Sequence, residues 1–344
     1  ALGHTWLRHG DRTVHLVEVH HPGDVDAMAA YRGRVRDGLP AEIAYDDALP
    51  REHWDPAARA AQLDTWGIER SVVFPNFGLL WERPLEGDVR AQTVNMRAWN
   101  RWAASVRADT RGRLEPVAHV TLRDLDWLDD ELASLERAGL RLAMVAPALV
   151  DGKRLSHPDL DRAWRAFVDR GITPVFHVSA FPHPFGDGWY DGDPDVVNPV
   201  LSSVFLSTAP ALALADLAVN GVFARHPDLR IGVMELSAIW VPQFLLVLDG
   251  GFDFHARFNG RPLSTLDRRP SEYIRDHVRI AAFGYERPDV LIRHAGDLFM
   301  FCSDWPHAEG VRRPVDDYVA ACSVAPDTDP LLFGGNVAWL LRES

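Results

Sequence analysis

Residues Leu298–His307 contain the most informative combination of side chains in the chain, and they read Leu-Phe-Met-Phe-Cys-Ser-Asp-Trp-Pro-His. An apolar run typical of a strand buried on both faces ends at Ser303, and Asp304 and His307 follow it. In folds built from parallel strands, chemistry takes place at the carboxyl ends of the strands. A carboxylate and an imidazole three residues apart can bind a metal ion or transfer protons. Local sequence leaves a second interpretation open, in which Asp304 caps the next helix and His307 lies on the surface.

Three other apolar runs also end in a side chain that can do chemistry, namely His119, His177 and Glu235. A buried histidine or glutamate is costly unless it is paired or ligated. A single one is more often a satisfied core residue, but several at one end of a parallel sheet favour a shared site. Imidazole and carboxylate donors without a thiolate suit Zn²⁺, Mn²⁺ or Fe²⁺, as one ion or two. Such an ion would activate a bound water.

The elements that must position these residues alternate between short apolar strands and amphipathic helices. The expected strands are Ser71–Pro75, Leu114–Val120, Leu142–Ala146, Thr173–Val178, Arg230–Leu236, Val278–Phe283 and Leu298–Cys302. The expected helices include Asp124–Ala138, Pro158–Arg170 and Ala209–Arg225. This alternation predicts a parallel sheet. With one more strand near the N-terminus, the pattern predicts a closed (β/α)8 TIM-like barrel. An open doubly wound sheet is the alternative, but no glycine-rich phosphate loop follows any strand.

Two segments do not fit the regular alternation. Phe181–Pro199 is rich in Pro, Gly and Asp and predicts a long loop inserted after strand five, of the kind that carries function. Thr13–His21 could be the first barrel strand, with His20 and Glu18 on one face. An edge strand or hairpin explains Thr13–His21 equally well.

Composition bounds the class of protein. The chain has 344 residues, 47% of them hydrophobic, and a net charge of −13 without a basic block, so a nucleic-acid partner is not expected. No apolar stretch is long enough to span a membrane, and Ala1–Gly10 does not read as a signal peptide. With only two cysteines, a cytoplasmic location is the expectation. Among the many aromatic residues, Trp240, Trp305 and Phe181 are candidates for the wall of a substrate pocket, although packing explains Trp240 equally well.

Several segments together resemble a known family. They are Gly67–Pro75, His157–Leu160, Phe176–Val178, Phe223–Ile231 and Ser303–His307. The chain resembles the amidohydrolase-related metal-dependent enzymes, in the branch that contains aminocarboxymuconate-semialdehyde decarboxylase and the aromatic-acid decarboxylases. The resemblance implies one barrel domain over residues 1–344, with 1–54 as a variable N-terminal region. The family's first-strand His-x-His pair is not recognisable, and truncation before this region is favoured over a degenerate version built on His20.

The resemblance also implies roles for individual residues. His177 matches the imidazole ligand of strand five, and Asp304 matches the carboxylate ligand of strand eight that also handles protons. Many decarboxylases of the branch carry a histidine after strand six, where this chain has Glu235. The segment Glu235–Pro242 fits the subgroup pattern Glu-x-x-Ala-x-Trp-x-Pro. A carboxylate faces an anionic substrate poorly, so this departure argues against plain decarboxylation.

The leading expectation is a metal-dependent hydrolase or decarboxylase that acts on a small apolar or aromatic carboxyl or acyl compound. The candidate metal ligands are His177, Asp304, Glu235, His119, His307 and His20, and the candidate catalytic residues are Asp304, His307 and Glu235. A non-haem diiron monooxygenase on the same barrel is the first alternative. A barrel that has lost catalysis is the second. The sequence leaves a homodimer open.

Overall fold

The computed structural model describes residues 5–9, 12–16, 34, 37–38, 51–75, 85–178, 185–189, 200–305 and 313–343. The strands are β1 Thr5–His9, β2 Arg12–Leu16, β3 Ser71–Val73, β4 Leu114–Pro116, β5 Ala118–His119, β6 Leu142–Met144, β7 Thr173–His177, β8 Ile231–Met234, β9 Val278–Ala282 and β10 Phe299–Phe301. Every strand expected from Ser71 onward is present, so that part of the prediction is confirmed.

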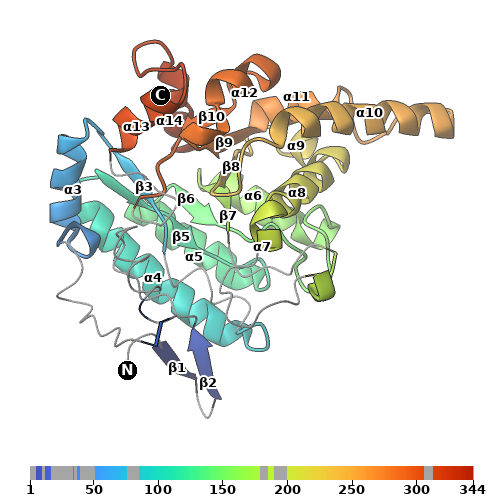
Figure 1. The fold of residues 1–344 in the computed structure, drawn as a ribbon. Coiled ribbons are helices and arrows are strands. Elements are labelled where there is room, and N and C mark those ends of the chain that lie inside the picture. Colours follow the sequence, from blue (N-terminus) through green and yellow to red (C-terminus); the bar gives the residue numbers. More distant parts are fainter. Residues whose placement is uncertain are drawn as a thin grey trace.

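The strands from β3 to β10 run parallel. One sheet has the order β10-β9-β8-β7-β6-β5, and β3 pairs with β4 in a second sheet. The two sheets adjoin because β4 and β5 are consecutive along the chain, and the amide of Val117 between them donates to the Val73 carbonyl (2.9 Å). The protein is therefore α/β with a parallel sheet, in which neighbours in sequence are neighbours in space (Figure 1).

The two faces of the sheet differ, as the period of two in a strand requires. One face packs against the helices and includes Ala143, Phe176 and Val233. The other face forms a separate apolar cluster on the inner side, with Val117, Leu142, Met144, Val175, Met234, Ala281 and Met300. His119 and His177 come two residues after Val117 and Val175, so both share the inner face. The strand period thus carries these two histidines to the inner side of the sheet.

Most of the helices cover the outer face of the sheet (Figure 1). The described helices are α3 Pro56–Thr65, α4 Val89–Asp109, α5 Leu125–Ala138, α6 Asp161–Asp169, α7 Val200–Val204, α8 Thr208–Val219, α9 Val222–Arg225, α10 Val241–Asn259, α11 Pro270–His277, α12 Pro288–Ala295, α13 Pro314–Ala321 and α14 Asn336–Leu340. Shorter turns are η1 Arg51–His53, η3 Pro158–Leu160, η4 Asp187–Trp189, η5 Gly284–Glu286 and η6 Leu331–Gly335.

The expected helices are confirmed, with breaks where the chain changes direction. Helix α5 begins after Asp124, whose side chain accepts from the Trp127 amide, and ends at Gly139 in the left-handed conformation. The stretch predicted as one helix over Ala209–Arg225 is two helices, α8 and α9. Gly221 separates them at φ 71°, a conformation that favours glycine.

The C-terminal helix α14 packs on the inner side of the sheet at the amino ends of the strands. Thr173, the first residue of β7, donates to the Leu340 carbonyl (2.7 Å). Gly232 in β8 lies so close that a Cβ there would be 3.2 Å from Leu340 Cδ1. Helix α14 therefore covers this end of the inner face, and the side chains at the carboxyl ends of the strands lie at the opposite end.

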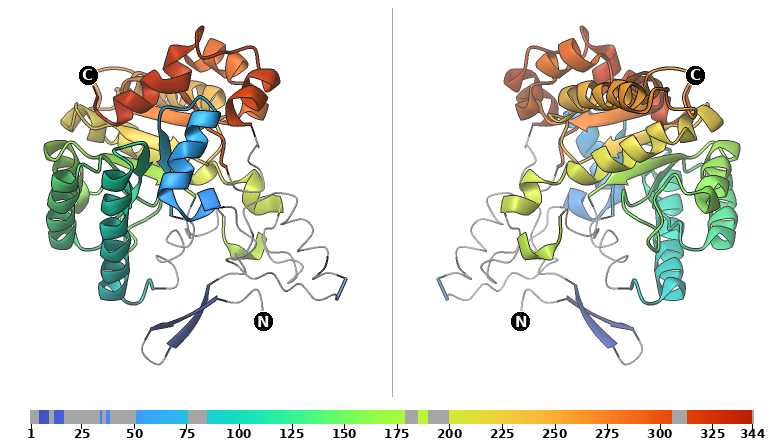
Figure 2. Two further views of the ribbon diagram at one scale, coloured as in Figure 1. Left: turned by 90° about the vertical axis from the view of Figure 1, so that its left-hand side faces the viewer. Right: turned by 90° about the vertical axis from the view of Figure 1, so that its right-hand side faces the viewer.

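The N-terminal segment forms a hairpin. Strands β1 and β2 pair antiparallel with each other, with Thr5 opposite Leu16, and Figure 2 shows them apart from the parallel sheet. Residues 13–16 of the predicted segment thus lie in the second strand of a hairpin, while residues 17–21, including His20, lie outside the described part. No described strand pairs with the free edges of β3 and β10, so closure of the predicted eight-stranded barrel stays a prediction.

The described helices include none that is long and apolar enough to cross a membrane. Helix α10 exposes several large apolar side chains, including Leu246, Phe254 and Phe258. The homodimer stays a prediction. The long insertion after strand five is described only over residues 185–189, where η4 lies.

His277, at the end of α11, predicts a pH dependence of stability. Burial lowers the pKa of this imidazole, which lies against the Leu229 carbonyl (Nδ1 to O, 2.6 Å). The unfolded chain therefore takes up a proton near pH 6.5 that the folded chain resists. We expect the free energy of unfolding to fall as the pH drops from about 7 towards 5. The His277→Asn variant should lose much of that slope in urea titrations, and exposed His294→Asn should not. An unchanged slope in His277→Asn would contradict the assignment.

Candidate active site

The centre of the candidate site is a contact between His177 and Glu235. His177 is the last residue of β7, and Glu235 follows β8 directly. His177 Nε2 lies 2.8 Å from Glu235 Oε2, and the two side chains are 3% and 17% exposed. Because β7 and β8 are adjacent and parallel, their carboxyl ends bring together residues that are 58 positions apart in sequence. The prediction that these residues meet is confirmed.

The hydrogen bonding of His177 determines which ring nitrogen carries the proton in the neutral imidazole. Nδ1 lies 2.9 Å from the Val178 carbonyl. A carbonyl can only accept, so Nδ1 carries the proton. In the neutral ring Nε2 is then an acceptor, facing a carboxylate oxygen that is also an acceptor. This arrangement needs a proton or a cation at that point. It is the environment expected of a metal-ligating or proton-transferring imidazole.

The His177 ring is also held by packing. Phe74, which follows β3, stacks on it with ring centroids 3.9 Å apart. The site therefore has one apolar wall directly against its imidazole.

Asp304 lies at the same edge, three residues after β10. Its Oδ2 atom is shielded from solvent. Burial raises the pKa of the neighbouring Cys302 thiol, and the carboxylates of Glu286, Asp304 and Glu235 raise it further. The edge formed by β8, β9 and β10 is thus acidic, and Cys302 is held there as a neutral thiol.

Glu235 and Asp304 share an uncommon backbone conformation. Their φ angles are 54° and 52°, and Ser237 is also left-handed at φ 60°. Residues other than glycine adopt this conformation at a cost, and such strain concentrates at functional sites. The turn after each strand aims a carboxylate that regular backbone would direct elsewhere.

A residue that sequence reasoning missed, Glu286, holds the turn after β8. One carboxylate oxygen accepts from Ser237 Oγ (2.6 Å) and from the Ala238 amide (2.9 Å), and the other accepts from the Phe283 amide (2.8 Å). Glu286 is 4% exposed. It therefore fixes the backbone next to Glu235 from the neighbouring β9 turn. No local signal in Gly-Tyr-Glu-Arg-Pro indicates this, because the contacts span almost 50 residues.

The free energy of unfolding of the Glu286→Gln variant should be lower by about 1–3 kcal/mol. The reason is that the amide nitrogen would face N–H or O–H donors that now bond to a carboxylate oxygen. It should also reduce turnover by displacing Glu235. Urea unfolding and an activity assay check both effects. The exposed Glu136→Gln, which breaks only a surface pair with Arg170, is the matched control. Full stability of Glu286→Gln would show that these bonds do not hold the turn.

The predicted pocket residues have unequal contacts. Trp305 packs edge-on against His53 and Trp66, and the Arg59 guanidinium lies 4.0 Å from the centre of its ring. Trp240 donates from its indole nitrogen to the Ser237 carbonyl (2.9 Å) and packs on Phe244, so its described contacts are those of a packing residue. Phe181 lies outside the described residues. The assignment of all three to a pocket stays a prediction.

Arg59 is a second residue that the sequence did not single out. Burial lowers its pKa to about 10, and its Nε donates to the Glu52 carbonyl (2.8 Å). Within the described residues no carboxylate lies at ion-pair distance from it, and the charge of Glu52 acts on it from farther away. It supplies a positive charge on the Trp305 side of the acidic edge.

His119 is fully buried on the inner face, at the end of β5. Its backbone is held from α4, because the Asn100 amide nitrogen donates to the His119 carbonyl (3.0 Å) and Asn100 Oδ1 accepts from the His119 amide (2.7 Å). Metal ligation by His119 stays a prediction. The same holds for His307 and His20, which lie outside the described residues.

The described residues fit a metal ion in part. His177 Nε2 and Glu235 Oε2 form a donor pair of the types that Zn²⁺, Mn²⁺ and Fe²⁺ accept. The described side chains contain no group of three or more His, Cys, Asp or Glu arranged to hold an ion. The pair would thus provide two ligands, and further ligands would come from Asp304 or from residues that are not described.

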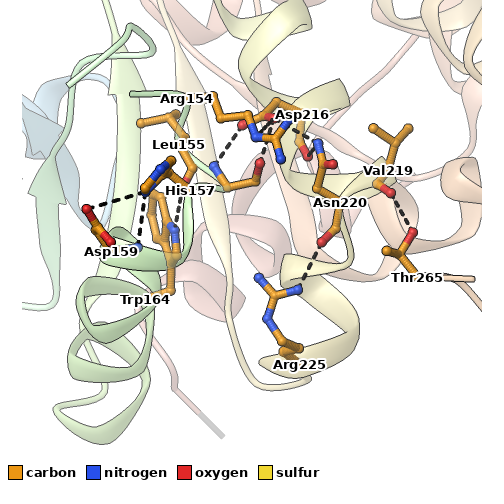
Figure 3. Close-up of polar contacts among 11 residues, drawn as sticks. Arg154, Leu155, His157, Asp159, Trp164, Asp216, Val219, Asn220, Arg225 and Thr265 are labelled. Atoms are coloured by element: carbon orange, nitrogen blue, oxygen red, sulfur yellow. Dashed lines mark hydrogen bonds and ion pairs between the residues drawn. The ribbon is translucent and has the colours of Figure 1, made fainter. Parts of the chain in front are cut away.

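The segment His157–Leu160 of the resemblance lies in a structural region. Beside it, Asp216 of α8 accepts from the Ser156 amide and hydroxyl (2.8 and 2.7 Å), which ties the loop after β6 to α8. Asp216 also accepts from Asn220 (2.9 Å), as Figure 3 shows. His157 caps η3 by accepting from the Asp159 amide (3.2 Å). These contacts fix the frame around the site and take no part in it.

A family model described as Amidohydrolase matches residues 4–342, and the chain belongs to this family. Comparison with curated proteins finds no match. Among solved structures, an amidohydrolase from Mycobacterium avium subsp. paratuberculosis K-10 has a TM-score of 0.75 at 23% identity, with 98% of this chain and 92% of that chain covered.

Two decarboxylases have similar folds. The 2,6-dihydroxybenzoate decarboxylase from Rhizobium has a TM-score of 0.67 at 20% identity, covering 90% of this chain and 94% of its own. The 5-carboxyvanillate decarboxylase from Novosphingobium aromaticivorans DSM 12444, solved with manganese and 4-hydroxy-3-methoxy-5-nitrobenzoic acid, has a TM-score of 0.66 at 17% identity, covering 93% of each chain. The expected family and fold class are thereby confirmed.

Proposed function

We propose that this protein is a metal-dependent hydrolase or decarboxylase that acts on a small aromatic or apolar carboxyl or acyl compound. The observation that carries the proposal is the His177–Glu235 contact, in which Nε2 lies 2.8 Å from a carboxylate oxygen while Nδ1 is held by the Val178 carbonyl. The fold it shares with decarboxylases of aromatic acids supports the substrate class.

His177, Glu235 and Asp304 would hold the divalent ion, which would supply Lewis-acid polarisation of the carboxyl or acyl oxygen. Val178 keeps the imidazole in the ligating tautomer through Nδ1. The Phe74 ring excludes water from one side of the imidazole. Asp304 carries the proton at its carboxylate, where burial of Oδ2 favours exchange with the substrate over exchange with solvent.

An acidic edge repels a carboxylate substrate, so a cation must compensate. Arg59 lies against the Trp305 ring, and its one side-chain hydrogen bond within the described residues runs from Nε to the Glu52 carbonyl. In this account Arg59 binds the substrate carboxylate, and Trp305 keeps the guanidinium in place.

Arg59→Gln should raise KM for carboxylate substrates about tenfold or more, because a charge-assisted hydrogen bond is lost, and should change KM little for neutral esters. Steady-state kinetics with both substrate types check this. Arg51→Gln on the exposed η1 turn, paired with Asp55, is the control. An equal rise in KM for both substrate types would show that Arg59 has only a packing role.

The proposed function is tested by incubating the chain, loaded with Mn²⁺ or Zn²⁺, with hydroxybenzoates and with aryl esters. Release of CO₂ identifies a decarboxylase, and release of acid from the ester identifies a hydrolase. Turnover of neither class by protein that binds metal would contradict the proposal.

The diiron oxygenase remains the second candidate because His119 and His177 share the inner face with carboxylates at the strand ends. Two irons per chain and O₂-dependent turnover would establish it in place of the first proposal.

A further inference from the structure

Four arginines gather at the amino ends of the strands, at the other end of the sheet from the candidate active site. Arg141 precedes β6, Arg230 precedes β8, Arg279 is the second residue of β9, and Arg342 follows α14. Within the described part of the chain, none of them forms an ion pair with a carboxylate. This is unexpected in a chain of net charge −13.

Two of the four share one aromatic ring. The guanidinium carbons of Arg230 and Arg279 lie 4.5 Å and 4.2 Å from the centre of the Trp339 ring in α14. Each also donates to the C-terminal segment, Arg230 to the Trp339 carbonyl and Arg279 to Asn336 Oδ1 (2.8 Å). The ring separates the two charges without neutralising either.

The other two meet at Gly171. A Cβ at that glycine would be 3.6 Å from Arg342 Cδ and 3.8 Å from Arg141 Nη1. Arg342 donates through one terminal nitrogen to the Asp228 carbonyl (3.0 Å). Its Nε is buried and has no hydrogen-bond partner among the described residues. A buried donor without an acceptor is costly and points to a group that binds there.

The charges act on one another. Burial, together with the neighbouring charges of Arg230 and Arg141, lowers the pKa of Arg342 to about 10. Burial also lowers the pKa of Arg279, and Arg230 adds to that effect. Asp228, Asp276 and Asp297 act in the opposite direction from a distance. The cluster therefore has an excess of positive charge that the described chain does not balance.

We propose that Arg141, Arg230 and Arg342, supported by Arg279, form a binding site for a phosphate-type oxyanion. Planar guanidinium groups bind such oxygens through paired hydrogen bonds, and Arg342 Nε supplies one donor that is already in place. The bound anion would tie the C-terminal helix α14 to the amino ends of β6 and β8. The site is separate from the metal-binding end and does not depend on the proposed reaction.

The test measures binding of inorganic phosphate by calorimetry, with chloride at the same ionic strength as the blank and adenosine 5′-monophosphate as a second arm. At a phosphate concentration one hundred times Kd, the midpoint of thermal unfolding should rise by roughly 4 °C. Affinity should fall at least tenfold in Arg141→Gln and in Arg342→Gln. Arg141→Gln should fold normally, because its one described hydrogen bond is a long contact with the Arg170 carbonyl (3.5 Å).

Two controls locate the site. Arg162→Gln on α6, which is paired with Asp126 and Asp129, should bind phosphate as the wild type does. His177→Ala should also retain phosphate binding, because the arginine cluster lies at the other end of the sheet. A phosphate bound at the metal-binding end would instead be lost in this variant. Binding of the monophosphate as tightly as phosphate would identify a terminal phosphate group as the ligand, and weaker binding would identify the free anion. Absence of binding in both arms, or unchanged affinity in Arg141→Gln, would overturn the proposal.

Discussion

Asp304→Asn should lower turnover by about two to four orders of magnitude while leaving the fold intact. The substitution removes the charge and the proton-carrying oxygen but keeps the shape of the side chain. The φ of 52° at this position is one that asparagine tolerates well, so the turn after β10 should be preserved. Steady-state kinetics and circular dichroism check the two parts of this expectation.

The control for this variant is Asp297→Asn, an exposed aspartate at the other end of β10. It should be fully active. If Asp304→Asn retained turnover within a few-fold of the wild type, Asp304 would be a helix cap, which is the interpretation that the local sequence had left open.

His177→Ala should abolish both turnover and the stabilisation of the fold by added metal. The wild type should unfold at a higher temperature when Mn²⁺ or Zn²⁺ is added, because an ion that binds only the folded state stabilises it. Without His177 Nε2, the proposed site loses one of its metal ligands beside Glu235. The midpoint temperature of unfolding should then no longer respond to metal. Thermal unfolding monitored with and without metal measures this directly.

The matched control is His294→Ala on the exposed side of α12, which should respond to metal as the wild type does. An equal metal response in His177→Ala would remove His177 from the ligand set, and the ion would have to bind elsewhere.

The strands and two of the strand-end side chains could be predicted from sequence because the signal is local. A continuous apolar run such as Thr173–His177 is typical of a strand buried on both faces, and parallel strands bring their carboxyl ends to one edge. The meeting of His177 with Glu235 follows from those two facts alone.

What sequence could not supply depends on contacts between distant segments. Glu286 acquires its role only when β8 and β9 bring its carboxylate to the Ser237–Ala238 turn. The arginine cluster forms because α14 folds back over the amino ends of the strands and places Trp339 between Arg230 and Arg279. The N-terminal segment carries alternating residues that suit a barrel strand or a hairpin, and periodicity cannot distinguish the two.

The central claim is that the carboxyl end of the sheet holds a divalent metal ion on His177 and its neighbouring carboxylates. Elemental analysis of anaerobically purified protein, with the His177→Ala variant measured in parallel, tests it most directly. The account predicts at least one Zn, Mn or Fe per chain in the wild type and almost none in the variant. Full metal occupancy in His177→Ala, or a metal-free wild type that still turns over its substrate, would contradict it.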